Sequence, residues 1–220
     1  MLEGGNYHMN VIAELGRSGI VPVVVIENSE QALPLADALI KGGITCAEIT
    51  FRTEAAEESI RSIRKAFPEM LIGAGTVLTT AQVDKAIGAG ADFIVSPGFN
   101  PKVAEHSRKC GADMIPGVLT PSEIEAALSA GYKTLKIFPA EPSGGAKYIK
   151  AISAPYRGVR FMPTGGINAA NFPDYLKIWS VLACGGSWMV SGKLIAEGNF
   201  AEITRLSAQA IAIVKEFRGE

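Results

Sequence analysis

One sequence pattern decides the fold, and it is seen in Ala130-Gly131-Tyr132-Lys133-Thr134-Leu135-Lys136-Ile137: small residues end a helix, and a short apolar strand follows. The same pattern recurs at residues 41–51, 88–95 and 110–115. Glycine commonly stops a helix, and the marker glycines here are Gly43, Gly90, Gly111 and Gly131. Their intervals of 47, 21 and 20 residues indicate a unit of slightly over twenty residues, because the first interval holds an extra copy near 67–73. One strand, one helix and two short loops fit that length.

The repeat predicts strands that alternate strictly with helices. We expect strands near 20–26, 46–51, 70–75, 92–96, 113–116, 133–138, 159–163 and 180–184. We expect helices near 10–18, 30–41, 54–66, 80–88, 101–109, 121–130, 145–153, 169–177 and 200–217. Such alternation implies an α/β fold with a parallel sheet and right-handed crossovers. The fold is therefore predicted to be a single (β/α)8 TIM barrel with an additional N-terminal helix, and an open doubly wound sheet is the alternative.

Start signals and the chain ends refine this prediction. Asn28, Thr120 and Asn168 are N-cap residue types placed before the first, fifth and seventh repeat helices. Residues 1–8 end in a histidine just before a second methionine, so we interpret them as an expression-vector remnant. Residues 9–220 contain no stretch longer than a loop that resembles a linker, and they are predicted to form one catalytic domain.

Composition excludes several classes of partner. The net charge is −1, acidic and basic residues are scattered, and no basic block with interleaved aromatics occurs, so nucleic acid is not expected. No apolar run approaches the roughly 20 residues that span a bilayer, so no membrane contact is expected. The three cysteines, Cys46, Cys110 and Cys184, are far apart and are interpreted as small buried hydrophobes in a reducing, cytoplasmic compartment. Their spacing argues against a disulfide framework or a structural zinc site, and the presence of only two histidines argues against a multi-histidine metal site and against most histidine-based acid–base schemes.

Lys136 is the first candidate catalytic residue, as an amine nucleophile. Side chains alternate between the two faces of a strand, so Lys136 shares a face with Thr134 and Phe138. Burial favours the neutral form of an amine, which is the nucleophilic form. The structural alternative is a lysine at a strand end with its ammonium group in water.

The second predicted strand supplies a matching carboxylate. Glu48, Thr50 and Arg52 share one face, while the opposite face is apolar and belongs under the helices. A carboxylate that points into a barrel needs a partner to offset its desolvation. An internal ion pair of Glu48 with Lys136 or Arg52 would be a purely structural reason for it. Because Arg52 lies four residues further toward the mouth, we expect Glu48 to transfer protons and Arg52 to bind a substrate anion.

Small residues mark the ends of the later strands. Two glycine pairs, 165–166 and 185–186, follow the seventh and eighth predicted strands, and Ser187 follows the second pair. Barrels often bind phosphate with these two loops, because glycines expose backbone N–H groups to the anion. Thr76 after Gly75 offers a hydroxyl, and Pro97 forms a rigid turn that could wall a pocket. Simple turn geometry is the alternative interpretation of all these stretches.

Together these residues predict a reaction class. A buried amine attacks a carbonyl carbon and forms an iminium, which withdraws electrons when the neighbouring carbon–carbon bond breaks. One acid–base group can serve both halves of the cycle, and neither metal nor cofactor is needed.

The chain resembles the 2-keto-3-deoxy-6-phosphogluconate (KDPG) and 4-hydroxy-2-oxoglutarate (KHG) aldolases. The resemblance covers residues 10–217 and rests on six motifs in family order: GITCAEITFR at 43–52, IGAGTVL at 72–78, FIVSPG at 93–98, LKIFPA at 135–140, FMPTGGI at 161–167 and GGSW at 185–188. It implies a (β/α)8 class I aldolase, a metal-independent lyase that is usually a homotrimer and that cleaves a 2-keto-3-deoxy sugar acid to pyruvate and an aldehyde.

The resemblance also implies a role for each matching residue. Lys136 would form the Schiff base and Glu48 would move protons. Arg52 and Thr76 would hold the pyruvate carboxylate with help from the backbone near Gly75. The remaining positions would shape the pocket (Pro97 and Phe138), contact the substrate chain (Thr164) and bind the phosphate (Gly165, Gly166 and Ser187).

Several alternatives stay open at this point. The physiological substrate could be the phosphogluconate, hydroxyoxoglutarate or a phosphogalactonate epimer. A non-aldolase phosphate-binding barrel, such as a ribulose-phosphate epimerase or a thiamine-phosphate-synthase-like protein, is the closest rival. A catalytically silent sugar-phosphate-binding barrel is a third class, but it would need neither Glu48 nor Lys136.

Overall fold

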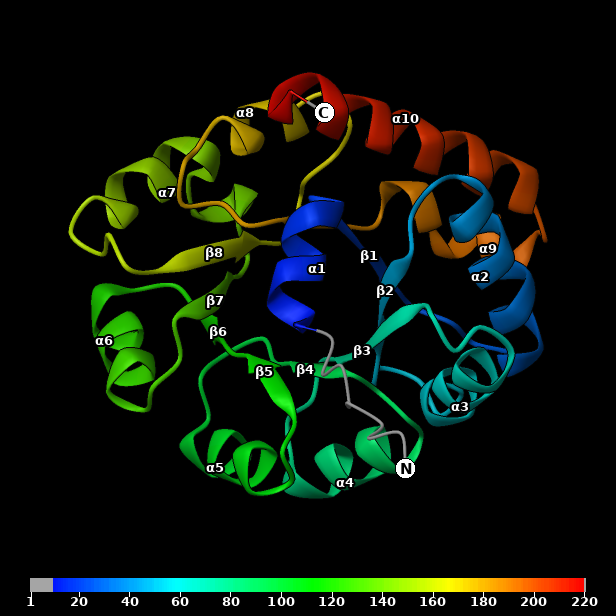
Figure 1. Ribbon diagram of the computed structural model, residues 1–220, viewed down its shortest axis with the longest axis horizontal. Helices are drawn as coiled ribbons and strands as arrows, with labels where there is room; N and C mark the ends of the chain where they lie inside the picture. The colour runs from blue at the N-terminus through cyan, green and yellow to red at the C-terminus, as the bar shows by residue number, and fades with distance from the viewer. Residues whose placement is uncertain (1–9, 220) are drawn as a thin grey trace, which may run out of the picture.

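Strands and helices alternate along residues 10–219, the part of the chain that the computed structural model describes (Figure 1). The strands are β1 (Ile20–Val24), β2 (Cys46–Thr50), β3 (Leu71–Gly75), β4 (Phe93–Val95), β5 (Asp113–Ile115), β6 (Gly117–Val118), β7 (Thr134–Ile137), β8 (Arg160–Pro163) and β9 (Cys184–Gly186). The helices are α1 (Val11–Ser18), α2 (Ala32–Lys41), α3 (Ala56–Ala66), α4 (Thr80–Gly88), α5 (Pro101–Lys109), α6 (Pro121–Ser129), α7 (Gly145–Ser153), α8 (Phe172–Leu176), α9 (Gly192–Ala196) and α10 (Phe200–Arg218). Short 3-10 turns are η1 (Ser29–Gln31), η2 (Glu141–Ser143) and η3 (Trp188–Val190). The predicted vector remnant, residues 1–8, lies outside the described residues.

The strands form two curled parallel sheets. One has six strands in the order β5-β4-β3-β2-β1-β9, and the other has three in the order β6-β7-β8. Two single bridges, Phe161 with Val181 and Thr164 with Gly185, connect β8 to the segment of β9. Pro116, which has no N–H to donate, separates β5 from β6, so the predicted strand 113–116 corresponds to β5, and β6 beyond it was not predicted. The predicted parallel α/β sheet is confirmed.

Helix starts follow the capping residues only in part. Thr120 and Glu123 form a complete capping box at α6, as the sequence predicts. Asn28 caps η1 instead of α2, because a 3-10 turn precedes that helix. Asn168 was expected to start a helix near 169, but α8 begins at Phe172. Its side chain instead accepts hydrogen bonds from the backbone N–H groups of Ala170 and Asn171, which makes it a turn residue.

The last strand differs most from the prediction. The strand expected at 180–184 lies at Cys184–Gly186, so the second glycine pair is inside the strand and does not follow it. A Cβ atom on Gly185 would lie 2.3 Å from Thr164 Oγ1, and one on Gly186 would lie 2.0 Å from the Trp188 ring. These glycines therefore allow close packing inside a strand. A Gly-Gly pair resembles a turn in the sequence, so the pattern does not reveal this role. The short helix α9 was also not predicted.

Helices surround the curled strands, and α1 lies across one end of them (Figure 1). Val11 and Leu15 of α1 are buried in the hydrophobic core, which also holds the apolar side chains of the strands. Among the described residues, no helix is long and apolar enough to cross a membrane.

Candidate active site

Lys136 and Glu48 form a buried pair between β7 and β2. The Lys136 Nζ atom donates a hydrogen bond to Glu48 Oε1 at 3.2 Å, and the two side chains are 6% and 0% exposed. Leu135 and Ile137, the strand neighbours of Lys136, are buried on the opposite face, as strand alternation requires. Within the described part of the chain, Glu48 Oε2 has no hydrogen-bond partner. An amine and a carboxylate with one unused oxygen therefore face each other away from water.

Two glycines create the space for this pair. A Cβ atom on Gly75 of β3 would lie 2.2 Å from Glu48 Oε1, so only glycine leaves room for the carboxylate. Gly117 of β6 pairs directly with Lys136, and its Cβ would lie 2.2 Å from the Pro97 carbonyl oxygen. Pro97 thus lies against the strand that neighbours Lys136.

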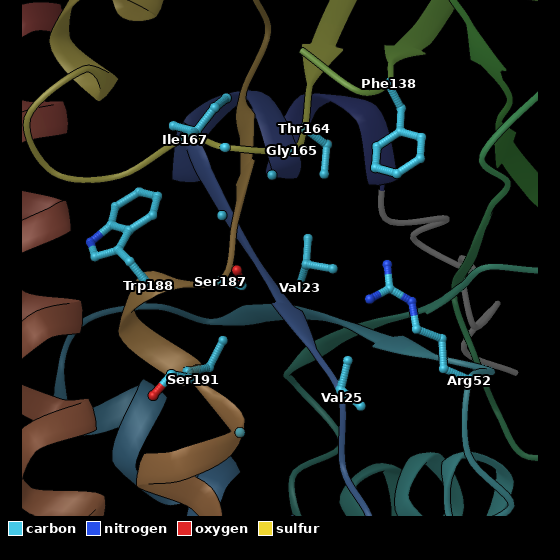
Figure 2. Close-up of a pocket in the computed structure, with 15 residues that line it drawn as sticks. Val23, Val25, Arg52, Phe138, Thr164, Gly165, Ile167, Ser187, Trp188 and Ser191 are labelled. Atoms are coloured by element: carbon cyan, nitrogen blue, oxygen red, sulfur yellow. The ribbon is translucent and has the colours of Figure 1, made fainter. Parts of the chain in front are cut away.

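A pocket of about 570 Å³ opens beside this pair. Six predicted site residues line it: Arg52, Phe138, Thr164, Gly165, Gly166 and Ser187. Figure 2 shows the Arg52 guanidinium group and the Phe138 ring on one side of the pocket and Trp188 on the other. The Lys136 Nζ atom is 5.4 Å from the centre of the Phe138 ring, so this ring connects the buried amine to the pocket wall. The other four predicted site residues, Lys136, Glu48, Thr76 and Pro97, are not among the lining residues.

The glycine-rich wall of the pocket has two parts. Gly165 and Gly166 follow β8 and have φ values of 103° and 81°, which favour glycine. Gly185 and Gly186 belong to β9 and pack against Thr164 and Trp188. The exposed backbone at Gly166 and the Ser187 side chain lie at the outer rim, where they can contact an anion.

Thr76 has an unusual backbone. Its φ is 57°, and it is the one non-glycine residue with positive φ in residues 10–219. A β-branched residue is strained in this conformation by about 1–3 kcal/mol. This backbone conformation turns the chain directly after Gly75, the last residue of β3, which lies against Glu48. The sequence offered no signal for this conformation, because threonine rarely adopts it.

Glu141 packs against the first glycine pair of the outer rim. Its side chain accepts a hydrogen bond from the Tyr175 hydroxyl, and burial together with this contact raises the pKa of Tyr175 above its ordinary value. The backbone N–H of Glu141 donates to the Gly165 carbonyl at 3.0 Å. A Cβ atom on Gly166 would lie 2.6 Å from Glu141 Cβ, so the first glycine pair rests on this side chain.

Several lining residues were not predicted. Val23, Val25, Trp188 and Ser191 contribute to the pocket and appear with the predicted residues in Figure 2. Val23 and Val25 belong to a continuous apolar run, in which alternation cannot distinguish the inner face from the outer one. Trp188 belongs to the GGSW motif at 185–188, and the signal for its role is the neighbouring Gly186, which makes room for the ring.

The cysteines divide into two groups. Burial raises the pKa of Cys46 to about 11 and also raises the pKa of Cys184, so both thiols stay protonated. They are the small buried hydrophobes that the sequence predicts. Cys110 is exposed, so the same interpretation is wrong for it, because it lies at the C-terminal end of α5 instead of under a helix.

Comparisons with known proteins agree with this geometry. The model of the KDPG and KHG aldolase family matches residues 11–206. A 2-dehydro-3-deoxy-phosphogluconate aldolase of Treponema pallidum is 49% identical over 94% of this chain and 98% of its own length. The crystal structure of KDPG aldolase from Legionella pneumophila, with pyruvate captured as a covalent carbinolamine, has a TM-score of 0.89, 40% identity and coverage of 92% and 98% of the two chains. The Zymomonas mobilis aldolase with 3-phosphoglycerate has a TM-score of 0.87, 38% identity and coverage of 93% and 96%.

Proposed function

The chain belongs to the KDPG and KHG aldolase family, and from that premise we propose that it is a class I aldolase that cleaves 2-keto-3-deoxy-6-phosphogluconate to pyruvate and glyceraldehyde 3-phosphate. The observation that carries this proposal is the contact of 3.2 Å between the buried Lys136 amine and the Glu48 carboxylate. It supplies the nucleophile and the acid–base group that this reaction needs.

The first half of the reaction forms the imine. Glu48 accepts a proton from the Lys136 ammonium group, and the neutral amine attacks the keto carbon at C2. The resulting carbinolamine loses its hydroxyl group as water when Glu48 returns the proton, which leaves an iminium. Burial of both groups keeps bulk water from competing for these protons.

The second half breaks the carbon–carbon bond. Glu48 removes the proton of the C4 hydroxyl group, the C3–C4 electrons move to the iminium nitrogen, and the aldehyde leaves. Glu48 then protonates C3 of the enamine, and water hydrolyses the new iminium to release pyruvate and the free amine. The unused Glu48 Oε2 atom is available for the substrate hydroxyl while Oε1 contacts Lys136.

The pocket residues fix the substrate at both ends. We assign the pyruvate carboxylate to Arg52 and Thr76, and contact with the middle of the chain to Thr164. Pro97 and Phe138 shape the space around the imine. The phosphate is assigned to the rim formed by Gly165, Gly166 and Ser187, because exposed backbone and a hydroxyl group suit an anion there.

A pocket of about 570 Å³ that includes the glycine-rich rim favours a phosphorylated six-carbon substrate, and 4-hydroxy-2-oxoglutarate, which has no phosphate for that rim, is the second candidate. The phosphogalactonate epimer differs only in stereochemistry and remains an alternative. A lysine-independent barrel enzyme has no use for the Lys136–Glu48 pair, which disfavours the epimerase and synthase alternatives.

The test is chemical trapping of the imine. Incubation with pyruvate followed by borohydride is expected to attach a pyruvyl group to the peptide that contains Lys136, as read by mass spectrometry. Lys136→Arg should lose both the adduct and cleavage, since arginine does not form the imine. Lys133→Arg is the matched control, because Lys133 lies on the same segment but is exposed. An adduct on another lysine, or normal cleavage by Lys136→Arg, would refute the assignment.

Three further features belong to this proposal. The bridges between β8 and β9, and the adjacency of β5 and β6, support a closed eight-stranded barrel with β5 and β6 as one interrupted strand. The homotrimer stays a prediction that sedimentation equilibrium can test, and the cytoplasmic location stays a prediction as well.

A further inference from the structure

We propose that Asp84, His106 and Cys110 form a binding site for a zinc-class divalent ion on the outer surface, between α4 and α5. Asp84 Oδ1 is 2.6 Å from His106 Nε2. Cys110 Sγ is 3.7 Å from the same nitrogen and 4.0 Å from the same oxygen. The three ligand atoms thus all lie within 4.8 Å of one another. A carboxylate oxygen, an imidazole nitrogen and a thiolate sulfur are the three ligand types that Zn²⁺ uses in proteins.

The helices impose this convergence. His106 and Cys110 are four residues apart at the end of α5, so they project from one face of the helix. Asp84 projects from the neighbouring helix α4 toward that face. Two ligands from one helix turn and one from its neighbour would tie the two helices together when a metal ion binds.

The distances are close to those of a tetrahedral site. With ordinary zinc–ligand bond lengths, a nitrogen and an oxygen ligand lie about 3.3 Å apart, and a sulfur ligand lies about 3.5 Å from either. The observed N–O distance of 2.6 Å must therefore open by about 0.7 Å, and the two sulfur distances of 3.7 and 4.0 Å must shorten by about 0.2 and 0.5 Å. The Asp84 side chain is 60% exposed, so the two distances that involve its carboxylate can adjust by rotation of that side chain.

The same geometry argues against a nucleophilic catalytic triad. In such a triad the imidazole lies between nucleophile and carboxylate and contacts them through different nitrogens. Here the thiol and the carboxylate both face Nε2 of His106. Shared approach to one nitrogen is what ligation of a single ion between the three groups requires.

The basic side chains near the proposed site contact other groups. Arg108 donates to the Ala130 carbonyl and lies over the Tyr132 ring, on the side of α6. Lys109 pairs with Glu105, and Lys85 lines a small pocket next to α3. The carboxylate and the thiolate, once its proton is released to solvent, would neutralise the charge of a divalent ion.

The site lies outside the catalytic pocket, so binding can be measured independently of turnover. The probe is Co²⁺, which takes zinc sites and gives a sulfur-to-metal charge-transfer absorption when a thiolate binds. The whole reduced protein, kept in a thiol-free reductant, is expected to bind one Co²⁺ per chain with this absorption, and Zn²⁺ should abolish the colour. Cys46 and Cys184 are buried and do not provide this signal.

Variants separate this site from other sources of binding. Cys110→Ser should lose the charge-transfer absorption, and His106→Gln and Asp84→Asn should each weaken Co²⁺ binding by tenfold or more. His8→Gln is the control for the other histidine and should bind as the parent protein does. Circular dichroism of the metal-free variants checks that they fold. Absence of the absorption in the folded parent protein, its persistence in Cys110→Ser, or its loss in His8→Gln would each overturn the proposal.

Discussion

Gly75→Ala is expected to damage catalysis by displacing Glu48. The new Cβ atom would lie 2.2 Å from Glu48 Oε1, whereas ordinary van der Waals contact begins at 3.4 Å, so the carboxylate must move by about 1.2 Å. Its hydrogen bond to Lys136, now 3.2 Å long, is then lost or reoriented. A misplacement of about 1 Å at a catalytic group can cost about 10²-fold in rate, and we expect a loss of that size in kcat.

Gly73→Ala is the matched control on the same strand. Gly73 pairs with Glu48 across the strands, but the three atoms nearest to its Cβ, at 2.2–2.6 Å, all belong to the Phe93 ring, whereas those nearest to the Gly75 Cβ all belong to Glu48. Neither glycine has positive φ, so alanine suits the main chain at both positions. Each substitution overpacks the interior and should destabilise the protein by about 1–3 kcal/mol.

The assay is pyruvate release from 2-keto-3-deoxy-6-phosphogluconate, coupled to lactate dehydrogenase, with denaturant unfolding measured in parallel. Gly75→Ala should lose kcat about 10²-fold, and Gly73→Ala should retain kcat at a similar loss of stability. Equal kcat values for the two variants, whether both low or both normal, would refute the argument that Gly75 acts by making room for Glu48.

Three other variants test separate parts of the site and fold. Glu48→Gln should lower kcat by about 10²–10⁴-fold with little change in stability, as measured by the coupled assay and by thermal unfolding. Ser187→Ala should raise KM for the phosphorylated substrate by roughly tenfold and leave KM for 4-hydroxy-2-oxoglutarate unchanged, since it removes a hydrogen bond to a charged group; equal effects on both substrates would place the phosphate elsewhere. Hydrogen bonds from the backbone N–H groups of Thr120 and Leu119 hold the pKa of Glu123 below its usual 4.5, so its stabilisation is present above pH 4.5 and is lost as pH falls through the lower folded value. The stability difference between the parent protein and Glu123→Gln should accordingly shrink in acid, which denaturant unfolding at several pH values measures.

The sequence predicts the repeat and the inward-facing positions of Lys136 and Glu48, for identifiable reasons. Lys136 and Glu48 are 88 residues apart, but strand alternation and the cost of burying a charge place both on inner faces. The marker glycines Gly43, Gly90, Gly111 and Gly131 follow α2, α4, α5 and α6 with positive φ, so they mark the unit length, whereas α3 and α7 end without such a glycine.

Features that depend on tertiary packing were not predictable from local pattern. The Gly185–Gly186 pair resembles a turn, but it belongs to β9, where Thr164 and Trp188 occupy the space of the missing side chains. The φ of 57° at Thr76 contradicts local preference and is imposed by surrounding structure. Cys110 is followed by the small residues Gly111 and Ala112 but preceded by Arg108 and Lys109, and its position at the end of α5 exposes it.

The position of α1 has a consequence for the order in which products leave. The helix covers the end of the strands opposite the pocket, and Figure 2 shows it behind the pocket residues, so substrate and products share one mouth. In the proposed mechanism, pyruvate stays covalently attached to Lys136 at the inner end of this passage, while the aldehyde phosphate occupies the proposed phosphate site at the rim. The aldehyde must depart before water can reach the imine, so release is ordered and the outgoing aldehyde shields the intermediate from early hydrolysis. Product inhibition should report this order: pyruvate, the last to leave, competes with the substrate, and glyceraldehyde 3-phosphate inhibits noncompetitively.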